Sequence, residues 1–155
     1  MIVGVISDTH GLLRPEALEL LRGSEHILHA GDMGAPEIVP ELEKIAPVTA
    51  IRGNVDVQAW AQRYPATEVV ELGGATFYLI HDVNTLDLDP KAAGFTAVIS
   101  GHSHQHRQET RSGVLYFNPG SAGPRRFNLP ITLGRLRVTD GVIEARLLDV
   151  KVASK

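Results

Sequence analysis

The chain has 155 residues and a formal net charge of −3 at neutral pH, with 43% hydrophobic and 21% charged residues. These values indicate one soluble globular domain, residues 1–155, and they argue against bulk binding of nucleic acid or of an anionic membrane. The sequence has no cysteine, which excludes disulfides and thiolate chemistry, and it has neither a membrane-length apolar run nor a basic leader, so a cytoplasmic protein is expected.

The first half of the chain alternates short apolar runs with helical patterns. We expect strands at residues 2–7, 26–30 and 48–51, separated by one helix between Pro15 and Gly23 and another over about 36–46. A β-α-β-α-β order predicts a parallel sheet with helices packed on it. Ligands of such sheets bind outside the carboxyl ends of the strands, where Asp8, Asp32 and Asn54 stand.

The second half is richer in strand patterns. Its turns are marked by Gly73-Gly74 and by Asp140-Gly141, each of which predicts a hairpin. We expect one short helix within residues 86–93, a frayed tail from Lys151, and strands at 68–72, 75–80, 96–100, 114–117, 131–138 and 142–150. No repeat or linker divides the chain.

Side chains of the metal-ligand type close several of the expected strands. Asp8 and His10 stand two residues apart, as do His102 and His104, and residues i and i+2 of an extended backbone point to the same side. Three other strands end beside further polar side chains, namely Asp32, Asn54 and His81. Seven oxygen and nitrogen donors are more than one ion takes, which predicts two divalent metal ions, Mn²⁺ first and otherwise Fe, Zn²⁺ or Ni²⁺.

Two ions bridged by a carboxylate, about 3.5–4 Å apart, would acidify a bridging hydroxide, and phosphoester hydrolysis is the reaction that they serve most directly.

Other polar residues are open to a structural interpretation. Asp56 either hydrogen-bonds a ligand or the backbone, or caps a helix. Arg125-Arg126 either contact a substrate phosphate or form a solvated loop. A structural or solvent role is expected for His26, His29 and His106.

The chain resembles the calcineurin-like metallophosphoesterase superfamily in five blocks that occur in order: Asp8-x-His10, Gly31-Asp32, Gly53-Asn54, His81 and Gly101-His102-x-His104. Two further segments, residues 53–56 and 118–121, are similar to its small bacterial and archaeal phosphodiesterase branch. The resemblance implies an α/β fold, a four-layer α-β-β-α sandwich of two mixed β-sheets flanked by helices.

The same resemblance implies a role for each candidate site residue. One metal would be bound by Asp8, His10 and His104, the other by Asn54, His81 and His102, with Asp32 bridging them. Catalysis would involve Asn54, Asp32 and His102. The implied activity is hydrolysis of a small or nucleotide-like phosphodiester, with a metal-bridging hydroxide as nucleophile. Its partner would be that small-molecule substrate, and similar proteins are commonly dimers or tetramers.

Two positions depart from the family pattern. Many relatives have a histidine after the Gly-Asn pair, where it protonates the leaving oxygen, but this chain has Val55. Relatives often have glycine after the histidine at position 81, and this chain has Asp82, so a different backbone is expected there. Two alternatives stay open. The superfamily includes a trafficking-complex subunit that uses this fold to bind partners, so a non-catalytic protein-interaction scaffold is one, although the intact ligand set favours an enzyme. A phosphomonoesterase is the other, and the missing histidine makes it less attractive.

Overall fold

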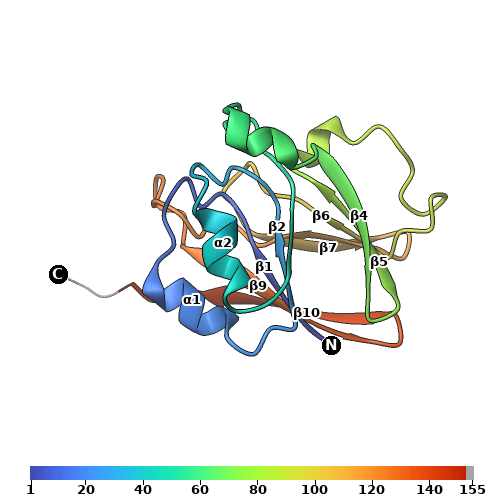
Figure 1. Ribbon diagram of the computed structural model, residues 1–155. Coiled ribbons are helices and arrows are strands. Elements are labelled where there is room, and N and C mark those ends of the chain that lie inside the picture. The colour runs from blue at the N-terminus through green and yellow to red at the C-terminus, as the bar shows by residue number, and fades with distance from the viewer. Residues whose placement is uncertain (153–155) are drawn as a thin grey trace.

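The computed structural model describes residues 1–152, which fold into two five-stranded sheets packed face to face (Figure 1). The first sheet contains β1 (Ile2–Ile6), β2 (His26–His29), β3 (Val48–Ala50), β9 (Thr132–Thr139) and β10 (Val142–Asp149). The second contains β4 (Thr67–Leu72), β5 (Ala75–Ile80), β6 (Ala97–Ile99), β7 (Arg107–Arg111) and β8 (Val114–Asn118). The helices are α1 (Pro15–Leu21), α2 (Ile38–Glu43) and the 3₁₀ helices η1 (Ala59–Arg63) and η2 (Val83–Thr85).

The first sheet has the order β10-β9-β1-β2-β3, in which β1, β2 and β3 are parallel and β9 and β10 are antiparallel to their neighbours. This confirms the parallel arrangement predicted from the β-α-β-α-β order. Since the three parallel strands end at one edge, the loops after Ile6, His29 and Ala50 come together there.

The second sheet has the order β4-β5-β6-β8-β7, with β5, β6 and β8 parallel and β4 and β7 antiparallel at its edges. Both predicted hairpins form, β4–β5 through Gly73-Gly74 and β9–β10 through Asp140-Gly141. The two hairpin tips meet at the end of the sandwich away from the carboxyl ends of β1 and β5, where the Gly141 N–H donates to the Gly73 carbonyl at 2.9 Å.

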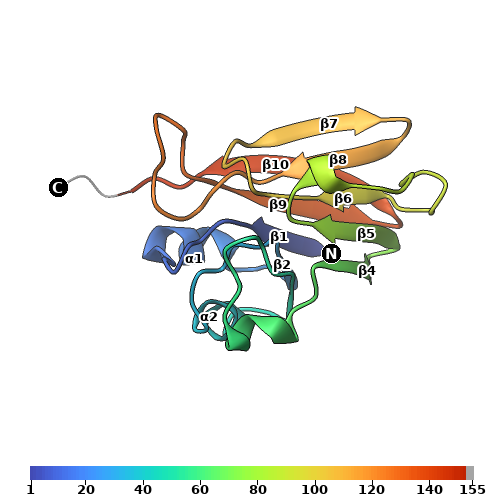
Figure 2. The same cartoon turned by 90° about the horizontal axis from the view of Figure 1, so that it is seen from above.

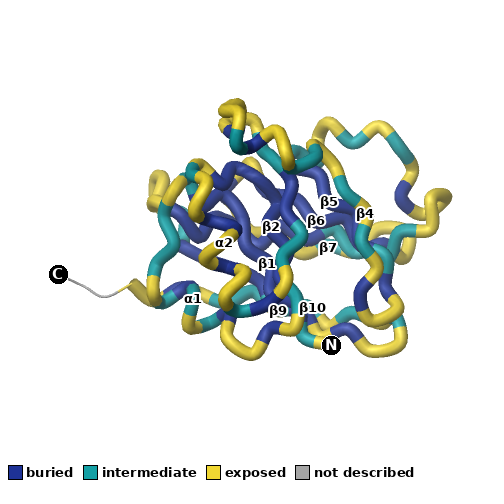
Figure 3. Tube along the Cα trace, viewed as in Figure 1, coloured by how far each residue is buried: buried dark blue, intermediate teal, exposed yellow. Residues whose placement is uncertain are grey.

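Successive side chains of a strand point to opposite faces of the first sheet, and one apolar core forms on each face. Val3 and Val5 of β1 face the second sheet and share a core with Phe77 and Phe117, while Ile6 packs on the helical side. Leu21 and Leu42 anchor α1 and α2 on that outer face (Figure 2). Burial is accordingly concentrated on the central strands, and exposure on the surrounding loops (Figure 3).

The expected sandwich of two mixed sheets is confirmed, with helices outside the first sheet, whereas the layer outside the second sheet is a loop and not the expected α-helix. The helix predicted within residues 86–93 is wrong: η2 precedes that segment, and turns capped by Asp89 follow. The apolar residues of this loop, among them Leu86 and Phe95, still cover Tyr78 and Val98. No helix of residues 1–152 is long and apolar enough to cross a membrane.

Two elements were missed or misjudged for local reasons. Strand β7 consists of Arg-Gln-Glu-Thr-Arg and carries no apolar alternation, so only its pairing with β8 makes it a strand. Helix α2 is shorter than the 36–46 predicted and tightens at its end, where the Lys44 N–H bonds to the Glu41 carbonyl.

Replacing Gly134 in β9 tests the packing between the sheets. A Cβ at Gly134 would lie 2.6 Å from Phe117 Cζ in the shared core. We expect Gly134→Ala to lower the free energy of unfolding by about 1–3 kcal/mol through overpacking, measured by urea denaturation. Phe117→Leu makes room, so the double variant should lose less than the two single losses added together; additive losses would contradict this account.

Candidate metal centre

The site residues stand on turns that follow the strands of both sheets. Eight non-glycine residues within 1–152 have positive φ, and five of them are candidate site residues: Asp8, His10, Asp32, His102 and His104. Main-chain hydrogen bonds hold two of these turns together, from the Asp8 N–H to the Gly31 carbonyl and from the His10 N–H to the Asp32 carbonyl, both at 3.0 Å. Strained backbone of this kind concentrates at functional sites, because only the surrounding structure can maintain it.

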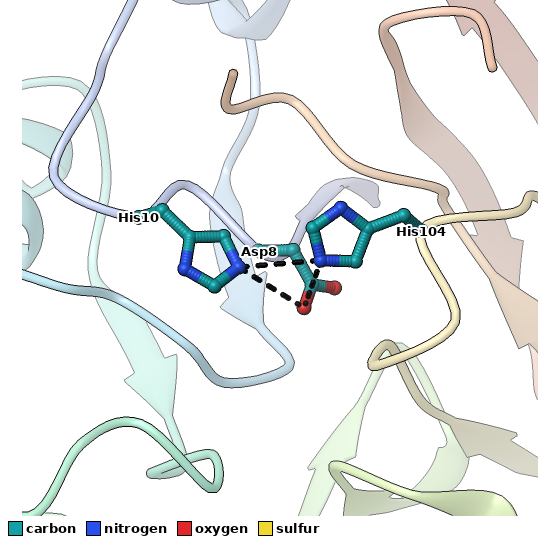
Figure 4. A group of neighbouring side chains, drawn as sticks. All are labelled: Asp8, His10 and His104. Carbon is teal, nitrogen blue, oxygen red and sulfur yellow. Dashed lines mark hydrogen bonds and ion pairs between the residues drawn. The ribbon is translucent and has the colours of Figure 1, made fainter. Parts of the chain in front are cut away.

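Asp8, His10 and His104 form one group of donor atoms (Figure 4). The Nε2 atoms of His10 and His104 are 3.2 Å apart, and they lie 3.9 and 3.5 Å from Asp8 Oδ1. Donors around a metal ion at 2.0–2.2 Å are about 3.0–3.5 Å from one another. The three atoms therefore have a spacing close to that of a metal's ligands.

Asp32, His81 and His102 form a second group of donors. His81 Nε2 lies 3.1 Å from Asp32 Oδ2, while its Nδ1–H donates to the Ala30 carbonyl at 2.7 Å. Asn54 Oδ1 lies 3.1 Å from His102 Nδ1, which places the amide at this group as well. All seven predicted site residues thus meet at one place.

Asp32 lies between the two groups. Its Oδ2 atom is 3.1 Å from His81 Nε2 and 3.7 Å from His10 Nε2, while its Oδ1 accepts a hydrogen bond from the Val55 N–H at 3.0 Å. One carboxylate oxygen is thus fixed by the main chain, and the other faces donors of both groups. Asp32 Oδ2 thus lies within reach of donors from both groups.

Burial sets the protonation of this site. It raises the pKa of Asp8 to about 6 and lowers the pKa of His104 to about 4. Burial also acts to raise the pKa of Asp32, but the His81 ring 3.1 Å away and the hydrogen bond from the Val55 N–H outweigh it and hold the value at about 2. For His81, the neighbouring Asp32 and Asp8 outweigh burial and raise its pKa.

Two buried donor atoms are placed where a divalent cation would contact both. Asp8 Oδ1 and His81 Nε2 have no hydrogen-bond partner within the described residues and lie 3.8 Å apart. A buried carboxylate oxygen without a partner is costly, and a cation between these atoms would remove that cost. Carboxylate, amide and imidazole donors without thiolates suit Mn²⁺, Fe, Zn²⁺ or Ni²⁺.

Neighbouring polar groups orient the donors. Asp8 Oδ2 accepts from the Ser7 hydroxyl at 2.8 Å and from the His102 N–H at 3.1 Å, which leaves Oδ1 facing the histidines. Buried Asp56 accepts from the main-chain N–H groups of Met33, Gly34 and Gly53, and so ties the Asn54 turn to the Asp32 turn. This confirms the backbone-bonding interpretation of Asp56 over the helix cap.

The segment 118–121 holds the turn that carries His102 and His104 through hydrogen bonds. Asn118 Nδ2 donates to the Gly101 carbonyl at 2.9 Å and to the Ser103 hydroxyl at 3.2 Å. Gly101 itself packs so tightly that a Cβ there would lie 2.1 Å from Ser7 Oγ. The turn therefore depends on glycine and on the Asn118 amide together.

Two of the remaining histidines are structural, as expected. His29 is fully buried; its Nδ1 accepts from the Gly31 N–H, its Nε2 lies 3.0 Å from Thr9 Oγ1, and burial lowers its pKa to about 4. His26 bonds to Thr49 within the sheet. These bonds keep His29 neutral beside the turn that carries Asp32.

Two polar neighbours of the site were missed in the sequence. Ser7 gave no signal beyond its place next to Asp8. Asp82 was noted only as a departure from the family pattern, yet its Oδ2 lies 3.8 Å from His102 Nε2, the ring nitrogen that faces away from Asn54. Asp82 thus places a negative charge beside the His102 ring without hydrogen-bonding to it.

Metal affinity should depend steeply on pH around 6. Asp8, with its pKa raised to about 6, and His81, with its pKa raised above the usual value, must both lose protons before they bind a cation. We expect the affinity for Mn²⁺ to fall as the pH drops through 6, by about tenfold or more per pH unit, with protons released on binding. Calorimetry in two buffers of different ionisation enthalpy measures both quantities.

The matched control for this titration is Asp140→Asn, which removes an exposed carboxylate at the far hairpin. It should leave the pH profile of metal binding unchanged. An affinity that stays flat between about pH 5 and pH 7 in the unaltered protein would contradict the assignment of these protons.

Comparison with known proteins places this geometry in a family. Residues 1–141 match the model of the calcineurin-like phosphoesterase superfamily domain. A protein of Methanothermobacter thermautotrophicus named as a probable metallophosphoesterase is 34% identical over 160 residues, covering 96% of this chain and 92% of that protein.

Solved structures agree with this match. A structure described as a novel archaeal phosphodiesterase has a TM-score of 0.78 at 26% identity, covering 96% of this chain and all of that one. Wild-type Vps29 of Entamoeba histolytica, solved in complex with Zn²⁺, shares the fold with a TM-score of 0.73 at 23% identity, covering 97% of this chain and all of Vps29. This protein belongs to the calcineurin-like phosphoesterase superfamily.

Proposed function

We propose that this protein is a divalent-metal-dependent phosphodiesterase that hydrolyses a small or nucleotide-like phosphodiester. The observation that carries the proposal is the convergence of seven donor side chains around two buried atoms without partners, Asp8 Oδ1 and His81 Nε2. The archaeal phosphodiesterase of similar structure supports the diester substrate.

In this proposal two ions, Mn²⁺ first, share the site. Asp8, His10 and His104 would hold one, and Asn54, His81 and His102 the other, with Asp32 Oδ2 between them. When bound, such a pair acidifies water and neutralises the charge on phosphoryl oxygens. Side chains of the protein would position the substrate phosphate and stabilise its charge.

Asn54 is suited to act on the substrate itself. Its Oδ1 faces His102, so its Nδ2–H₂ remains available to donate to a phosphoryl oxygen, and the residue is exposed. The bond from the Gly53 N–H to Asp56 holds this turn in place. A donor fixed in advance stabilises the charge that develops in the transition state.

Arg126 supplies a positive charge near His10 and His104. It lies on the exposed loop after Gly123, and its guanidinium contributes to the lowered pKa of both His10 and His104. Arginine suits bidentate contact with phosphate oxygens. We therefore assign Arg126, of the pair Arg125-Arg126, to the substrate phosphate.

The leaving group receives no proton from position 55. Val55 is 39% exposed beside Asn54 and carries no proton donor. Diesters with good leaving groups are therefore the favoured substrates, because their departing oxygen needs little protonation.

Hydrolysis of bis(p-nitrophenyl) phosphate and of p-nitrophenyl phosphate by metal-stripped protein reloaded with Mn²⁺ tests the function. We expect faster turnover of the diester, strict dependence on metal, and a loss of about 100-fold or more in kcat for Asn54→Ala. Gln62→Ala, which removes an exposed amide on η1, is the control and should retain full activity.

Two other outcomes would contradict the proposal and favour an alternative function. Faster turnover of the monoester would favour the phosphomonoesterase alternative. No turnover with Mn²⁺, Fe²⁺, Zn²⁺ or Ni²⁺, although two ions bind per chain, would favour the protein-interaction scaffold.

Introducing a histidine at position 55 tests whether the absence of a proton donor there limits hydrolysis of diesters with poor leaving groups. Val55→His should raise the rate by about tenfold or more for diesters with poor leaving groups and leave good leaving groups nearly unaffected, because general acid catalysis matters only for the former. A series of aryl esters of graded phenol pKa measures this. Val57→His, at a 72% exposed position two residues on, is the control; an unchanged leaving-group dependence in Val55→His would disprove the account.

A further inference from the structure

A groove of about 350 Å³ begins at His102 and runs over the outer face of the second sheet. Strands β7 and β8 form its floor and one wall, and the loop that contains η2 forms the other wall. Its main lining residues are Asp82, Leu86, His102, Arg107, Arg111 and Tyr116. The volume is that of a site for a small ligand.

The register of β7 against β8 brings positive charge to one wall of this groove. Arg107, Glu109 and Arg111 alternate along β7 and so share a face, and Glu109 stands directly opposite Tyr116. Arg107 and Arg111 both pair with the Glu109 carboxylate, and the Arg111 guanidinium lies 4.9 Å from the centre of the Tyr116 ring.

One carboxylate between two guanidiniums leaves a net positive charge. Hydrogen bonds from Arg111 and Arg107 hold the pKa of Glu109 at about 2, so this carboxylate stays ionised and the row keeps a charge of plus one. The other carboxylate of the groove, Asp82, faces His102 at 3.8 Å and accepts from the Asn84 N–H at 3.0 Å. The negative charge thus lies at the metal end, and the positive charge lies farther along.

We propose that this groove binds the alcohol that stays esterified to the scissile phosphate while the other alcohol leaves, and that Arg107 and Arg111 recognise a second phosphate on the part that stays. The inference rests on the proposed phosphodiesterase function and narrows its substrate to nucleotides or dinucleotides that carry a phosphate besides the scissile one. A sugar or base fits between that phosphate and the metal centre, against Tyr116 and Leu86. Guanidiniums pair with phosphate through parallel hydrogen bonds. Glu109, which is half-buried, accepts from Nε and Nη2 of Arg111 and from Nη2 of Arg107, so the Nη1 groups of both arginines are the donors that face a phosphate.

Two chromogenic substrates isolate the second phosphate: the p-nitrophenyl ester of thymidine 5′-phosphate, and the same ester with an added 3′-phosphate. With Mn²⁺-loaded protein, we expect the 3′-phosphate to raise kcat/KM by about tenfold. In the double variant Arg107→Gln/Arg111→Gln this gain should vanish, so that the two esters are hydrolysed with the same kcat/KM. Glu109→Gln, which removes the competing carboxylate, should enlarge the gain.

The control is Arg137→Gln/Arg146→Gln, which removes the same charge from exposed positions of the first sheet and should keep the gain. Equal loss of the gain in both double variants, or no gain in the unaltered protein, would overturn the inference while the phosphodiesterase function stands. Failure of the unaltered protein to hydrolyse either ester would overturn both. Thermal unfolding of each variant verifies that it is folded.

Discussion

The structure depends on the burial of two carboxylates, Asp8 and Asp32, among imidazoles at the edge where the two sheets meet. A buried carboxylate is stable only when it is hydrogen-bonded or paired with positive charge. Here each carboxylate has one oxygen bonded to main-chain or hydroxyl donors, and the other faces the site. The fold thus leaves one oxygen of each for a cation and fixes both in direction.

Holding these groups in place imposes a cost on the backbone. Five of the seven site residues adopt positive φ, and a non-glycine residue in such a conformation costs about 1–3 kcal/mol. Hydrogen bonds between neighbouring turns offset this cost, since Asp56 and the main-chain pairs between the Asp8 and Asp32 turns leave few main-chain groups unpaired there. Rigid turns thus hold the donors at a spacing close to that of metal ligands, which reduces the rearrangement that binding of a cation requires.

Much of this arrangement could be read from the sequence, because parallel strands end at a common edge and their last residues carry the donors. The β-α-β-α-β pattern and the two hairpin dipeptides therefore sufficed for most of both sheets and for the meeting of all seven site residues. Strand β7 could not be found, since Arg-Gln-Glu-Thr-Arg lacks alternation and its strand conformation comes from β8. The loop after η2 was misread as a helix, because covering Tyr78 and Val98 needs apolar side chains but no regular backbone. The contact of Asp82 with His102 joins two turns and has no local signature.

The contact between the hairpin tips, Gly73-Gly74 and Asp140-Gly141, makes the two ends of the sandwich differ in the groups that join the sheets. At that end the two sheets are joined by a main-chain hydrogen bond that no side-chain chemistry alters. At the opposite end the two sheets meet through titratable side chains. The first sheet contributes Asp8, His10 and Asp32, and the second contributes His81, His102 and His104. The contact between the sheets there therefore depends on the charges of these side chains. The tips therefore stay joined whatever the protonation of the site, while the contact between the sheets at the site depends on it. Local opening of the turns that carry the site residues would raise amide hydrogen exchange there before it rises at the tips, because the apolar core between the sheets holds the rest together.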